Sequence, residues 1–574
     1  MTSPSFTSRR SPVYGRNGIV ATSQPLATAA GLEMLALGGN AADAAVAAAA
    51  ALNVTEPTST GIGGDMFALY FDADTQQVTA LNGSGRAPAA LSLAQLAKDG
   101  ITDELPPFHA HTVTVPGACA GWFDLIEKHG SLPMADILVP AIRLANDGFP
   151  VAPLTSWFWK RGAGRQLQSA PNGRELTLDG RGPEPGEIFR NPGLARTFSA
   201  IAEGGRQAFY EGEIAAAIVA VLKQVGGRMT ESDLAEHVST WETPISADYR
   251  GLRVYECPPN GQGLAALLAL NILDGFDLAP LASLSTERLH LVIEALRLAF
   301  ADARWYVADP AFNDIPLAQL LSKQYSKERR KLISTEHATR NIPRGTPVSS
   351  SDTVYLSVVD QWGNACSFIN SNYMGFGTGI VPKGWGFTLQ NRGHNFSLDP
   401  NHPNCLAPRK RPYHTIIPAM VTRPPSPVGG RVGGEGLDTD YRPTRPSPPY
   451  RDQGEGDGET LYASYGVMGG FMQPQGHVQV LSALADDSLD PQSALDLPRF
   501  CIEAESTQGR VAIEEGMPDE TIAGLEKMGH PVYWVTGYER ALFGRGQAIL
   551  RDPVTGVLCA GSDPRADGCA MTLG

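Results

Sequence analysis

Two short features of the chain have residue types that could carry acyl-transfer chemistry. Thr353 opens a β-branched run that ends in a turn rich in Asp, Gly and Asn, and Gly469-Gly470 comes directly after another expected strand. A threonine hydroxyl is a poor nucleophile at neutral pH and needs a base. Glycines let backbone N–H groups approach closely, and such groups can stabilise an oxyanion. The plain alternatives are an ordinary strand residue and a tight turn.

Cleavage of the chain would supply the base that Thr353 needs. If the bond between Asp352 and Thr353 is cut, Thr353 gains a free α-amine, whose pKa is typically about 7.7–8.0. That value suits a general base near neutral pH, so nucleophile and base belong to one residue and no histidine is required. Before cleavage, the same hydroxyl would attack the carbonyl of Asp352 and give an ester that water opens.

Strand and helix signals place both features at the ends of regular elements. The composition predicts a strand over 353–359 and, after the turn, a second over 365–370. Further elements are expected as strands over 415–421 and 460–468 and as helices over 475–485 and near 491–497. Thr353 is therefore expected at the first position of a strand, and the diglycine just after one.

The earlier part of the chain is expected to mix a few strands with many helices, beginning with the order strand, helix, loop, strand from Gly18 to Phe71. Asn40 is a helix cap, and the alanine-rich helix that it begins should run to about residue 53, buried on every face. The other elements expected there are a helix over 31–37, strands over 66–71 and 112–116, and helices over 118–128, 213–225, 263–273 and 285–302. Residues 130–345 are mostly helical by periodicity.

Composition limits the class of protein. The chain has 574 residues, of which 42% are hydrophobic and 18% charged, which fits a globular protein. Its net charge of −14 leaves no basic excess for nucleic-acid phosphates. The N-terminus lacks the apolar core of a secretory signal, and the run 41–52 is too short to span a bilayer. Seven scattered cysteines without metal-site spacing predict a reducing, cytoplasmic location and no bound metal.

One segment differs in kind from the rest. Residues 423–459 contain seven prolines and eight glycines among 37 residues and almost no large aliphatic side chains. Such a segment cannot bury enough apolar surface to offset its ordering entropy. We expect a disordered insertion between two strands. A tolerated surface insertion is the plainer interpretation, and a regulatory or docking loop is the other.

Several blocks spread over nearly the whole chain resemble the γ-glutamyltranspeptidase family. They are Gly38-Gly39-Asn40, Gly61-Ile62-Gly63-Gly64-Asp65, Val113-Thr114-Val115-Pro116-Gly117, Pro258-Pro259-Asn260-Gly261, Phe376-Gly377-Thr378-Gly379-Ile380, Lys410-Arg411-Pro412 and Ser562-Asp563-Pro564-Arg565. The resemblance implies an α/β (α+β) fold, the four-layer αββα sandwich of N-terminal-nucleophile hydrolases. It also implies self-cleavage into a large subunit, 17–352, and a small subunit, 353–574, after a flexible segment 1–16.

The resemblance also implies roles for individual residues. Thr353 would be the nucleophile, and Gly469 and Gly470 would form the oxyanion site. Ser371 stands where the family has a threonine that hydrogen-bonds the nucleophile, and a serine keeps that hydroxyl. No cofactor is implied. The fragments would stay associated after cleavage, and a homodimer is left open.

The expected substrate pocket departs from the family pattern. Where family members hold the α-amine of the γ-glutamyl group with an aspartate, this chain has Asn395, which lacks the counter-charge for an ammonium. Arg392 stands where Glu or Gln is usual and adds positive charge. His414-Thr415 replaces a serine pair that binds the substrate carboxylate. Tyr373 replaces an asparagine, although Asn372 is adjacent.

One basic residue of the pocket is shifted along the sequence. The family arginine that holds the α-carboxylate aligns with Ser84, whereas this chain has Arg86. Residues two apart in an extended segment share a face, so Arg86 could reach the same pocket. A surface charge is the alternative.

These features leave three functions to compare. The first is a self-processing γ-glutamyltransferase-like enzyme that hydrolyses or transfers the γ-glutamyl group of glutathione-type amides through an acyl-threonine. The second is an acylase for glutaryl or other dicarboxylic amides, favoured by the lost ammonium partner. The third is an unprocessed, non-catalytic protein, against which the retained Thr353, Ser371 and Gly469-Gly470 argue.

Overall fold

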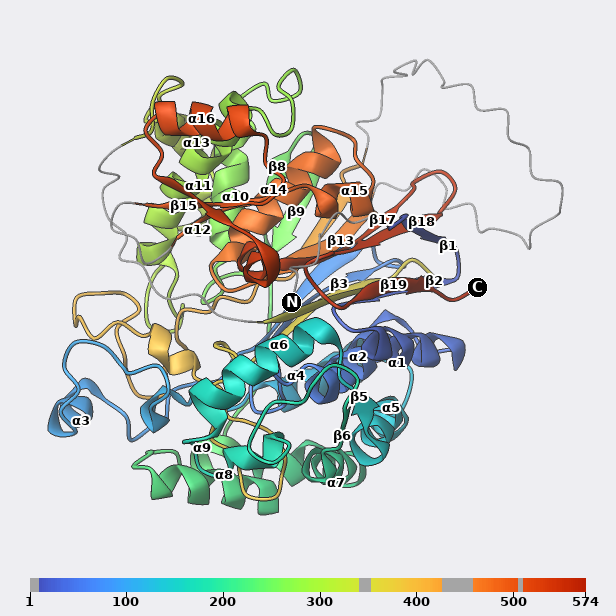
Figure 1. Ribbon diagram of the computed structural model, residues 1–574, viewed down its shortest axis with the longest axis vertical. Coiled ribbons are helices and arrows are strands. Elements are labelled where there is room, and N and C mark those ends of the chain that lie inside the picture. The colour runs from blue at the N-terminus through green and yellow to red at the C-terminus, as the bar shows by residue number, and fades with distance from the viewer. Residues whose placement is uncertain (1–9, 340–352, 426–457, 504–508) are drawn as a thin grey trace.

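Two seven-stranded antiparallel sheets face each other and carry helices on their outer faces (Figure 1). The computed structural model describes residues 10–339, 353–425, 458–503 and 509–574. In strand order, one sheet contains β19 (Cys569–Thr572), β2 (Gly18–Thr22), β10 (Val354–Asp360), β11 (Ala365–Ser371), β3 (Asp65–Asp72), β4 (Gln77–Gly83) and β7 (Thr240–Glu242). The other contains β1 (Val13–Gly15), β18 (Leu558–Ser562), β17 (Arg545–Arg551), β13 (Thr460–Met468), β12 (Ala419–Arg423), β9 (Leu252–Glu256) and β8 (Ile245–Tyr249).

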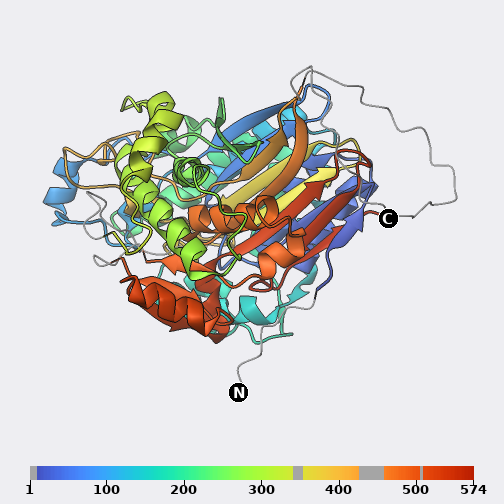
Figure 2. The same ribbon diagram turned by 90° about the horizontal axis from the view of Figure 1, so that it is seen from above.

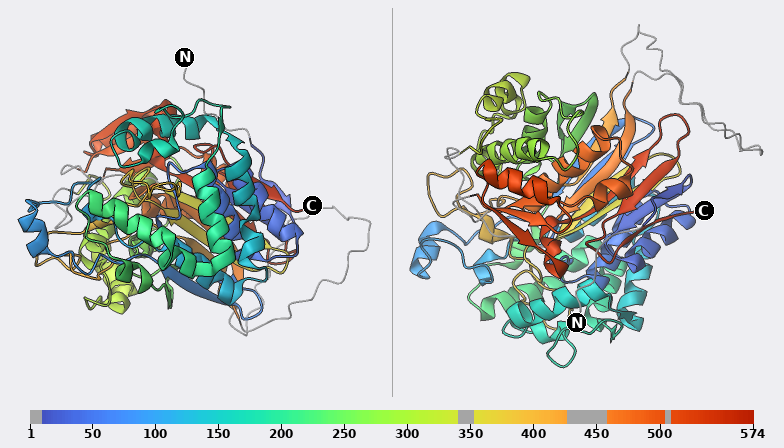
Figure 3. Two further views of the ribbon diagram at one scale, coloured as in Figure 1. Left: turned by 90° about the horizontal axis from the view of Figure 1, so that it is seen from below. Right: turned by 45° about the horizontal axis from the view of Figure 1, so that its top comes forward.

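Three apolar clusters separate four layers. The middle cluster lies between the two sheets and includes Phe67, Tyr355 and Ile369. The helices α1 (Pro25–Ala36), α2 (Ala41–Thr55), α4 (Ala118–His129), α5 (Met134–Asp147), α6 (Pro153–Gly162), α7 (Pro192–Tyr210) and α8 (Glu213–Gln224) belong to one outer layer, and the last three are the cyan and green helices seen from below in Figure 3. The helices α10 (Gly263–Leu273), α11 (Thr286–Tyr306) and α14 (Met472–Ala485) cover the other sheet (Figure 2). The predicted αββα sandwich is confirmed.

Local sequence signals account for the helices that were predicted well. Asn40 caps α2 by accepting from the N–H groups of Ala42 and Asp43, and Asp43 completes a capping box. Every residue of α2 is buried, which explains its small side chains. The predicted α4, α8, α10, α14 and β13 are also present. No helix among the described residues is both long and apolar enough to cross a membrane.

Three expectations about strands were wrong. Residues 113–116 form a loop rather than a strand, because Val115 and Gly117 donate to Arg86 and Gly64 on two different segments instead of to one partner strand. β12 begins at Ala419, later than predicted. β8 and β9, inside the largely helical region, were not predicted at all; β9 pairs with β12 and so extends the second sheet.

Residues at the ends of the two segments expected to be flexible form defined contacts. Val13–Gly15 already pair with β18, so a flexible N-terminal segment cannot extend to residue 16. Most of the insertion, 426–457, and residues 1–9 lie outside the described residues. At its ends, Arg423 stacks over Tyr462, and Glu459 pairs with an arginine of β9. Arg423 and Glu459, inside the predicted 423–459 boundaries, are therefore held by contacts to the second sheet.

The register of the first sheet gathers the ends of four strands at one edge. Val354 lies opposite Asn370, and Ser371 lies opposite Asp65 on the next strand. Met66 in turn lies opposite Gly83. Thr353, Ser371, Asp65 and Ser84 therefore follow one another along this edge, and the site is built on rigid strands.

Candidate active site

Thr353 is fully buried at the edge of the sheet and hydrogen-bonds two side chains. Its Oγ1 lies 3.3 Å from Ser371 Oγ on β11. It also accepts a hydrogen bond of 3.4 Å from Nε2 of Gln473, in the first turn of α14. Gln473 is itself held by the Ile417 N–H, which donates to its Oε1 at 3.0 Å. The structure thus brings Thr353 and Ser371 together as the sequence predicted.

Ser371 links the nucleophile to the positively charged part of the site. Its Oγ accepts from the Tyr373 N–H at 2.9 Å and from a terminal nitrogen of Arg392 at 3.0 Å. With both donors directed at its lone pairs, Ser371 can give its own proton to Thr353 Oγ1. This geometry orients the nucleophilic hydroxyl and places a cation one hydrogen bond beyond it.

Arg392 is a buried cation held by neutral groups. Its other terminal nitrogen donates to Thr415 Oγ1 at 2.6 Å, and its guanidinium lies 4.5 Å from the centre of the Tyr373 ring. The side chain is fully buried, its Nε has no partner, and no carboxylate of the described residues forms an ion pair with it. Burial lowers the pKa of Arg392 to about 10, so it stays charged near neutral pH.

Burying the Arg392 guanidinium in this way costs free energy unless an anion binds to it. A buried charge without a counter-ion loses its hydration and gains no ion pair in return. The two hydroxyls and the aromatic face compensate only in part. We conclude that Arg392 forms a site suited to a carboxylate.

Asn395 contacts the same tyrosine as Arg392, and its amide is already hydrogen-bonded. Its Oδ1 accepts from the Tyr373 hydroxyl at 2.5 Å, and its Nδ2 donates to the backbone oxygen of Tyr413 at 3.1 Å. Tyr373 adopts a left-handed backbone with φ of 79°, which is strained for a bulky residue and requires support from its surroundings. Asn395 therefore forms part of a packed Tyr373–Asn395–Tyr413 wall, and its role in binding substrate stays a prediction.

His414 and Thr415 have different roles. Thr415 contacts Arg392, whereas His414 turns towards the sheet and pairs with Asp65 Oδ2 at 3.0 Å. Burial lowers the pKa of His414 to about 3, helped by the charge of Arg392. The imidazole is therefore neutral near pH 7 and donates its Nε2–H to Asp65. Asp65 also accepts from the Gly85 N–H at 2.9 Å.

The diglycine has the backbone shape that only glycine adopts easily. Gly469 has φ of 128° and Gly470 φ of 58°, directly after β13. The Gly470 carbonyl accepts from Gln262 Nε2 at 2.8 Å, and the same nitrogen donates to the Thr415 carbonyl at 2.6 Å. Gln262 thus fixes the diglycine relative to the loop that supports Arg392.

Two predicted substrate residues point elsewhere. Arg86 is half-buried, and one of its terminal nitrogens donates to the Val238 carbonyl at 3.3 Å. Asn372 donates to Thr388 Oγ1 at 3.1 Å and packs against the glycine loop, close to Gly61. Neither shares a hydrogen bond with Thr353 or Arg392 in the part of the chain that the structure describes.

Sequence reasoning missed Gln473, Asp65 and Gln262. Gln473 could have been found as a polar residue in the first turn of a buried helix just after the diglycine. Asp65 is the last residue of the block Gly61-Ile62-Gly63-Gly64-Asp65. Its full burial is what indicates that it connects several parts of the site. Gln262 carried no local signal, because the Thr415 and Gly470 carbonyls to which its side chain donates lie more than 150 residues away in sequence.

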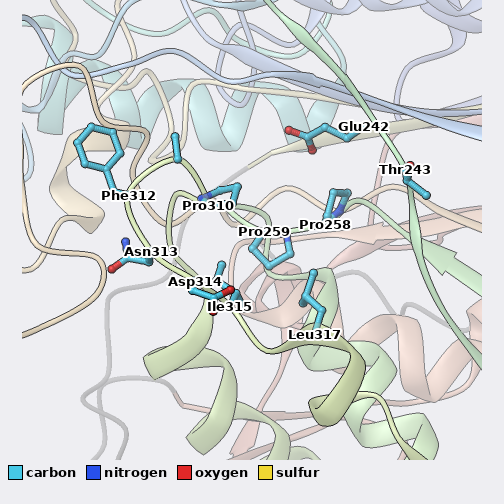
Figure 4. Close-up of a pocket in the computed structure, with 11 residues that line it drawn as sticks. Glu242, Thr243, Pro258, Pro259, Pro310, Phe312, Asn313, Asp314, Ile315 and Leu317 are labelled. Carbon is cyan, nitrogen blue, oxygen red and sulfur yellow. The ribbon is translucent and has the colours of Figure 1, made fainter.

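Two other features lie apart from this site. A cleft of about 670 Å³ between Glu242, Pro258 and Phe312 includes none of the residues around Thr353 in its lining (Figure 4). His290, Glu294 and His530 lie within 4.8 Å of one another, but His290 Nδ1 and His530 Nε2 hydrogen-bond at 2.7 Å. Glu294 pairs with Arg297 at 3.0 Å.

Comparison with known proteins identifies the family. The family model described as Gamma-glutamyltranspeptidase matches residues 27–439 and 455–573. The chain belongs to the γ-glutamyltranspeptidase family. It is 38% identical over 565 residues to the glutathione hydrolase-like YwrD proenzyme of Bacillus subtilis (strain 168), covering 98% of this chain and 99% of that protein. It is 32% identical to the acylase ACY 1 proenzyme of Pseudomonas sp. (strain SE83), with 99% and 96% covered.

Solved structures of this family agree with the fold. The crystal structure of cephalosporin acylase from Bacillus halodurans superimposes with a TM-score of 0.88 at 43% identity and covers 100% of this chain and 99% of that chain. As a γ-glutamyltranspeptidase family member with this fold, the chain is a hydrolytic enzyme of the N-terminal-nucleophile type.

Proposed function

We propose that this enzyme cleaves itself before Thr353 and then hydrolyses or transfers acyl groups that end in a carboxylate. The observation that carries the proposal is Arg392, a buried guanidinium that hydrogen-bonds the partner of the nucleophile and forms no ion pair among the described residues, the Asp65 carboxylate acting on it only at longer range. A substrate carboxylate would complete its ion pair in a water-excluded site. Dicarboxylic monoamides fit this requirement, and γ-glutamyl amides fit it in part.

The preference between these two classes depends on the ammonium. A γ-glutamyl donor brings an α-ammonium next to its carboxylate, and the amide of Asn395 offers it no charge and is already hydrogen-bonded on both ends. The relatives are consistent with both classes, since one is named glutathione hydrolase-like and others acylases. We therefore place the dicarboxylic acylase activity first and γ-glutamyl transfer second.

The mechanism uses few groups. The free α-amine of Thr353 takes the proton from Oγ1 as that oxygen attacks the amide carbonyl. Backbone N–H groups at Gly469 and Gly470 stabilise the oxyanion. The α-ammonium returns the proton to the departing amine, which leaves an acyl ester on Thr353. Water or an acceptor amine then attacks the ester and releases the acid or a new amide.

Three 4-nitroanilides of equal length test the proposal. Glutaryl, pentanoyl and L-γ-glutamyl donors share a five-carbon acyl chain and differ in the carboxylate and the ammonium. We expect kcat/KM for glutaryl to exceed that for pentanoyl by about ten- to a hundred-fold, the worth of a charge-assisted hydrogen bond. It should also exceed that for γ-glutamyl. Equal turnover of pentanoyl and glutaryl would contradict the carboxylate site.

Some aspects stay predictions. We expect the two fragments to stay associated after cleavage, because the relatives are named proenzymes. A cytoplasmic location is supported by seven free thiols. An inactive, unprocessed scaffold is the weakest alternative, because it would not require the Thr353–Ser371–Arg392 arrangement. A single uncleaved band on a denaturing gel would favour it.

A further inference from the structure

Gln473 directs a hydrogen-bond donor at the nucleophilic oxygen, and its orientation is fixed. The Ile417 N–H points at one atom of the Gln473 amide at 3.0 Å, and a backbone N–H can only donate, so this atom is the oxygen Oε1. The atom that faces Thr353 Oγ1 at 3.4 Å is therefore the nitrogen Nε2. Both side chains are fully buried. Gln473 thus offers Thr353 a donor and not an acceptor.

The backbone around Gln473 holds this donor in place. Gln473 lies in the first turn of α14, and its own N–H donates to the Gly470 carbonyl at 3.1 Å. The same carbonyl accepts from Gln262, which also donates to the Thr415 carbonyl. Ile417, two residues beyond Thr415, holds the Gln473 oxygen. The diglycine and the donor to the nucleophile therefore belong to one cross-linked unit.

Two donors occupy the lone pairs of the Thr353 hydroxyl. Ser371 Oγ accepts from the Tyr373 N–H and from Arg392, so its own proton goes to Thr353 Oγ1. Gln473 Nε2 is the second donor. A hydroxyl oxygen has two lone pairs and one proton. With both lone pairs accepting, the proton of Thr353 Oγ1 is left for transfer to a base.

We propose that Gln473 is a further catalytic residue, which stabilises negative charge on Thr353 Oγ1. When the α-amine takes the proton from Oγ1, the electron pair of the broken O–H bond is the pair that no donor holds. This pair forms the bond to the substrate carbonyl carbon, and the π electrons of the carbonyl move to its oxygen. The Gln473 N–H stabilises the charge on Oγ1 during the attack, and again when the acyl ester breaks and Oγ1 leaves. Such hydrogen bonds are often long without substrate and shorten in the reacting complex.

This role rests on Thr353 as the nucleophile of the proposed function. It does not depend on the acyl group, because Gln473 acts on an oxygen of the enzyme and not on the substrate carboxylate. Charged and uncharged donors should therefore be affected equally when the Gln473 donor is removed. Self-cleavage should be affected as well, because it uses the same oxygen.

Replacing the amide by a thioether tests the role. Gln473→Met keeps an unbranched side chain of similar length and has no N–H. We expect kcat for glutaryl 4-nitroanilide to fall about ten- to a hundred-fold, with KM changed less, because a hydrogen bond to a developing charge is lost. Pentanoyl 4-nitroanilide should lose the same factor. Self-cleavage of freshly translated protein, followed by intact mass spectrometry, should slow to a similar extent.

Gln475→Met is the matched control. Gln475 lies in the same helix and is also fully buried, but its amide donates to the carbonyls of Phe471 and Ile502. The control variant should have a lower melting temperature, because these bonds are lost. It should still cleave itself, and its kcat should stay within about three-fold of wild type.

Gln473→Glu gives a readout that a purely structural role would not change. A protonated carboxyl group can accept from the Ile417 N–H and still donate to Thr353 Oγ1, whereas a carboxylate cannot donate and repels the developing charge. The ratio of variant to wild-type kcat should therefore fall at least ten-fold between about pH 5 and pH 9, as the carboxyl group ionises. A ratio that rises with pH would contradict the donor role.

The outcomes separate this proposal from the proposed function. A loss of kcat in Gln473→Met no larger than in Gln475→Met would overturn the catalytic role and leave Thr353 as the nucleophile. If Gln473→Met stays uncleaved while Gln475→Met is cleaved, the loss of self-cleavage supports the role. If neither variant is cleaved, Gln473 acts through folding, and the role is overturned. Cleavage and activity in Thr353→Ala would instead overturn the proposed function.

Discussion

Ser371 and Asp65 lie directly opposite each other on the neighbouring strands β11 and β3. The Ser371 hydroxyl hydrogen-bonds the nucleophile. The Asp65 carboxylate accepts hydrogen bonds from His414 and from the Gly85 N–H. The pairing fixes the reacting edge and the pocket wall to one rigid sheet. Substitutions at this edge should therefore affect both turnover and folding stability, and the two effects can be measured separately.

Replacing the nucleophile tests self-processing. Thr353→Ala removes the hydroxyl that would attack the preceding carbonyl, so this protein should remain one chain and be inactive. Thr353→Ser keeps a hydroxyl and serves as the control, which should still be cleaved. Intact mass spectrometry distinguishes one chain from two. Efficient cleavage at this bond in the alanine variant would show that its hydroxyl is not the agent.

Removing the Ser371 hydroxyl should slow both processing and turnover. Ser371→Ala deletes the link between Thr353 and Arg392, and a lost hydrogen bond to a charged group costs about 1.5–3 kcal/mol. We expect kcat to fall about ten- to a hundred-fold. Ser371→Thr, which restores the hydroxyl, is the matched control. Unchanged kcat in the alanine variant would remove Ser371 from the mechanism.

Restoring a carboxylate at position 395 should favour γ-glutamyl donors. Asn395→Asp offers the ammonium a counter-charge, so the ratio of γ-glutamyl to glutaryl kcat/KM should rise about ten-fold or more. The same change removes the donor to the Tyr413 carbonyl, so a lower melting temperature is expected. An unchanged or reduced ratio would mean that the amine binds elsewhere.

The insertion should be dispensable if its packed ends are kept. Replacing 426–457 with a short Gly/Ser linker should leave processing and turnover within a few-fold of wild type. In contrast, Glu459→Ala breaks the contacts to Arg253, Tyr255 and Thr422 and should lower the melting temperature. An unprocessed or misfolded linker variant would show that the segment packs on the body.

Acid should destabilise the protein partly through His414. Its pKa is about 3 in the folded state, against about 6.5 when unfolded. Between these values the unfolded state binds the extra proton, so the free energy of unfolding falls as pH drops from about 6.5 towards 3. His414→Asn should reduce this slope by up to about 1.4 kcal/mol per pH unit. Denaturant titrations at several pH values measure it, and identical slopes would exclude His414 as a source.

Motifs predicted the reacting groups better than the pocket around them. Thr353, Ser371 and the diglycine sit at strand ends, where local sequence fixes position. Arg392 was expected near the substrate, but its bond to Ser371 depends on a short 3₁₀ helix, Arg392–Asn395, in a long connection between strands, which no periodicity describes. Arg86 follows the alternation of an extended segment, yet Val238, in the loop that precedes β7, offers it a partner far away in sequence. Asp65 needed the sheet register to reveal its role.

The interleaving of the sheets has a consequence for the cleaved protein. β10, which follows Thr353, lies between β2 and β11, and β12 pairs with β9 from before the cut. Strands of the two fragments are therefore hydrogen-bonded to each other at several places, and neither fragment contains a complete sheet. The assembly must form while the chain is still covalently whole. We expect unfolding after the cut to be hard to reverse, because refolding would then require two separate chains to find each other.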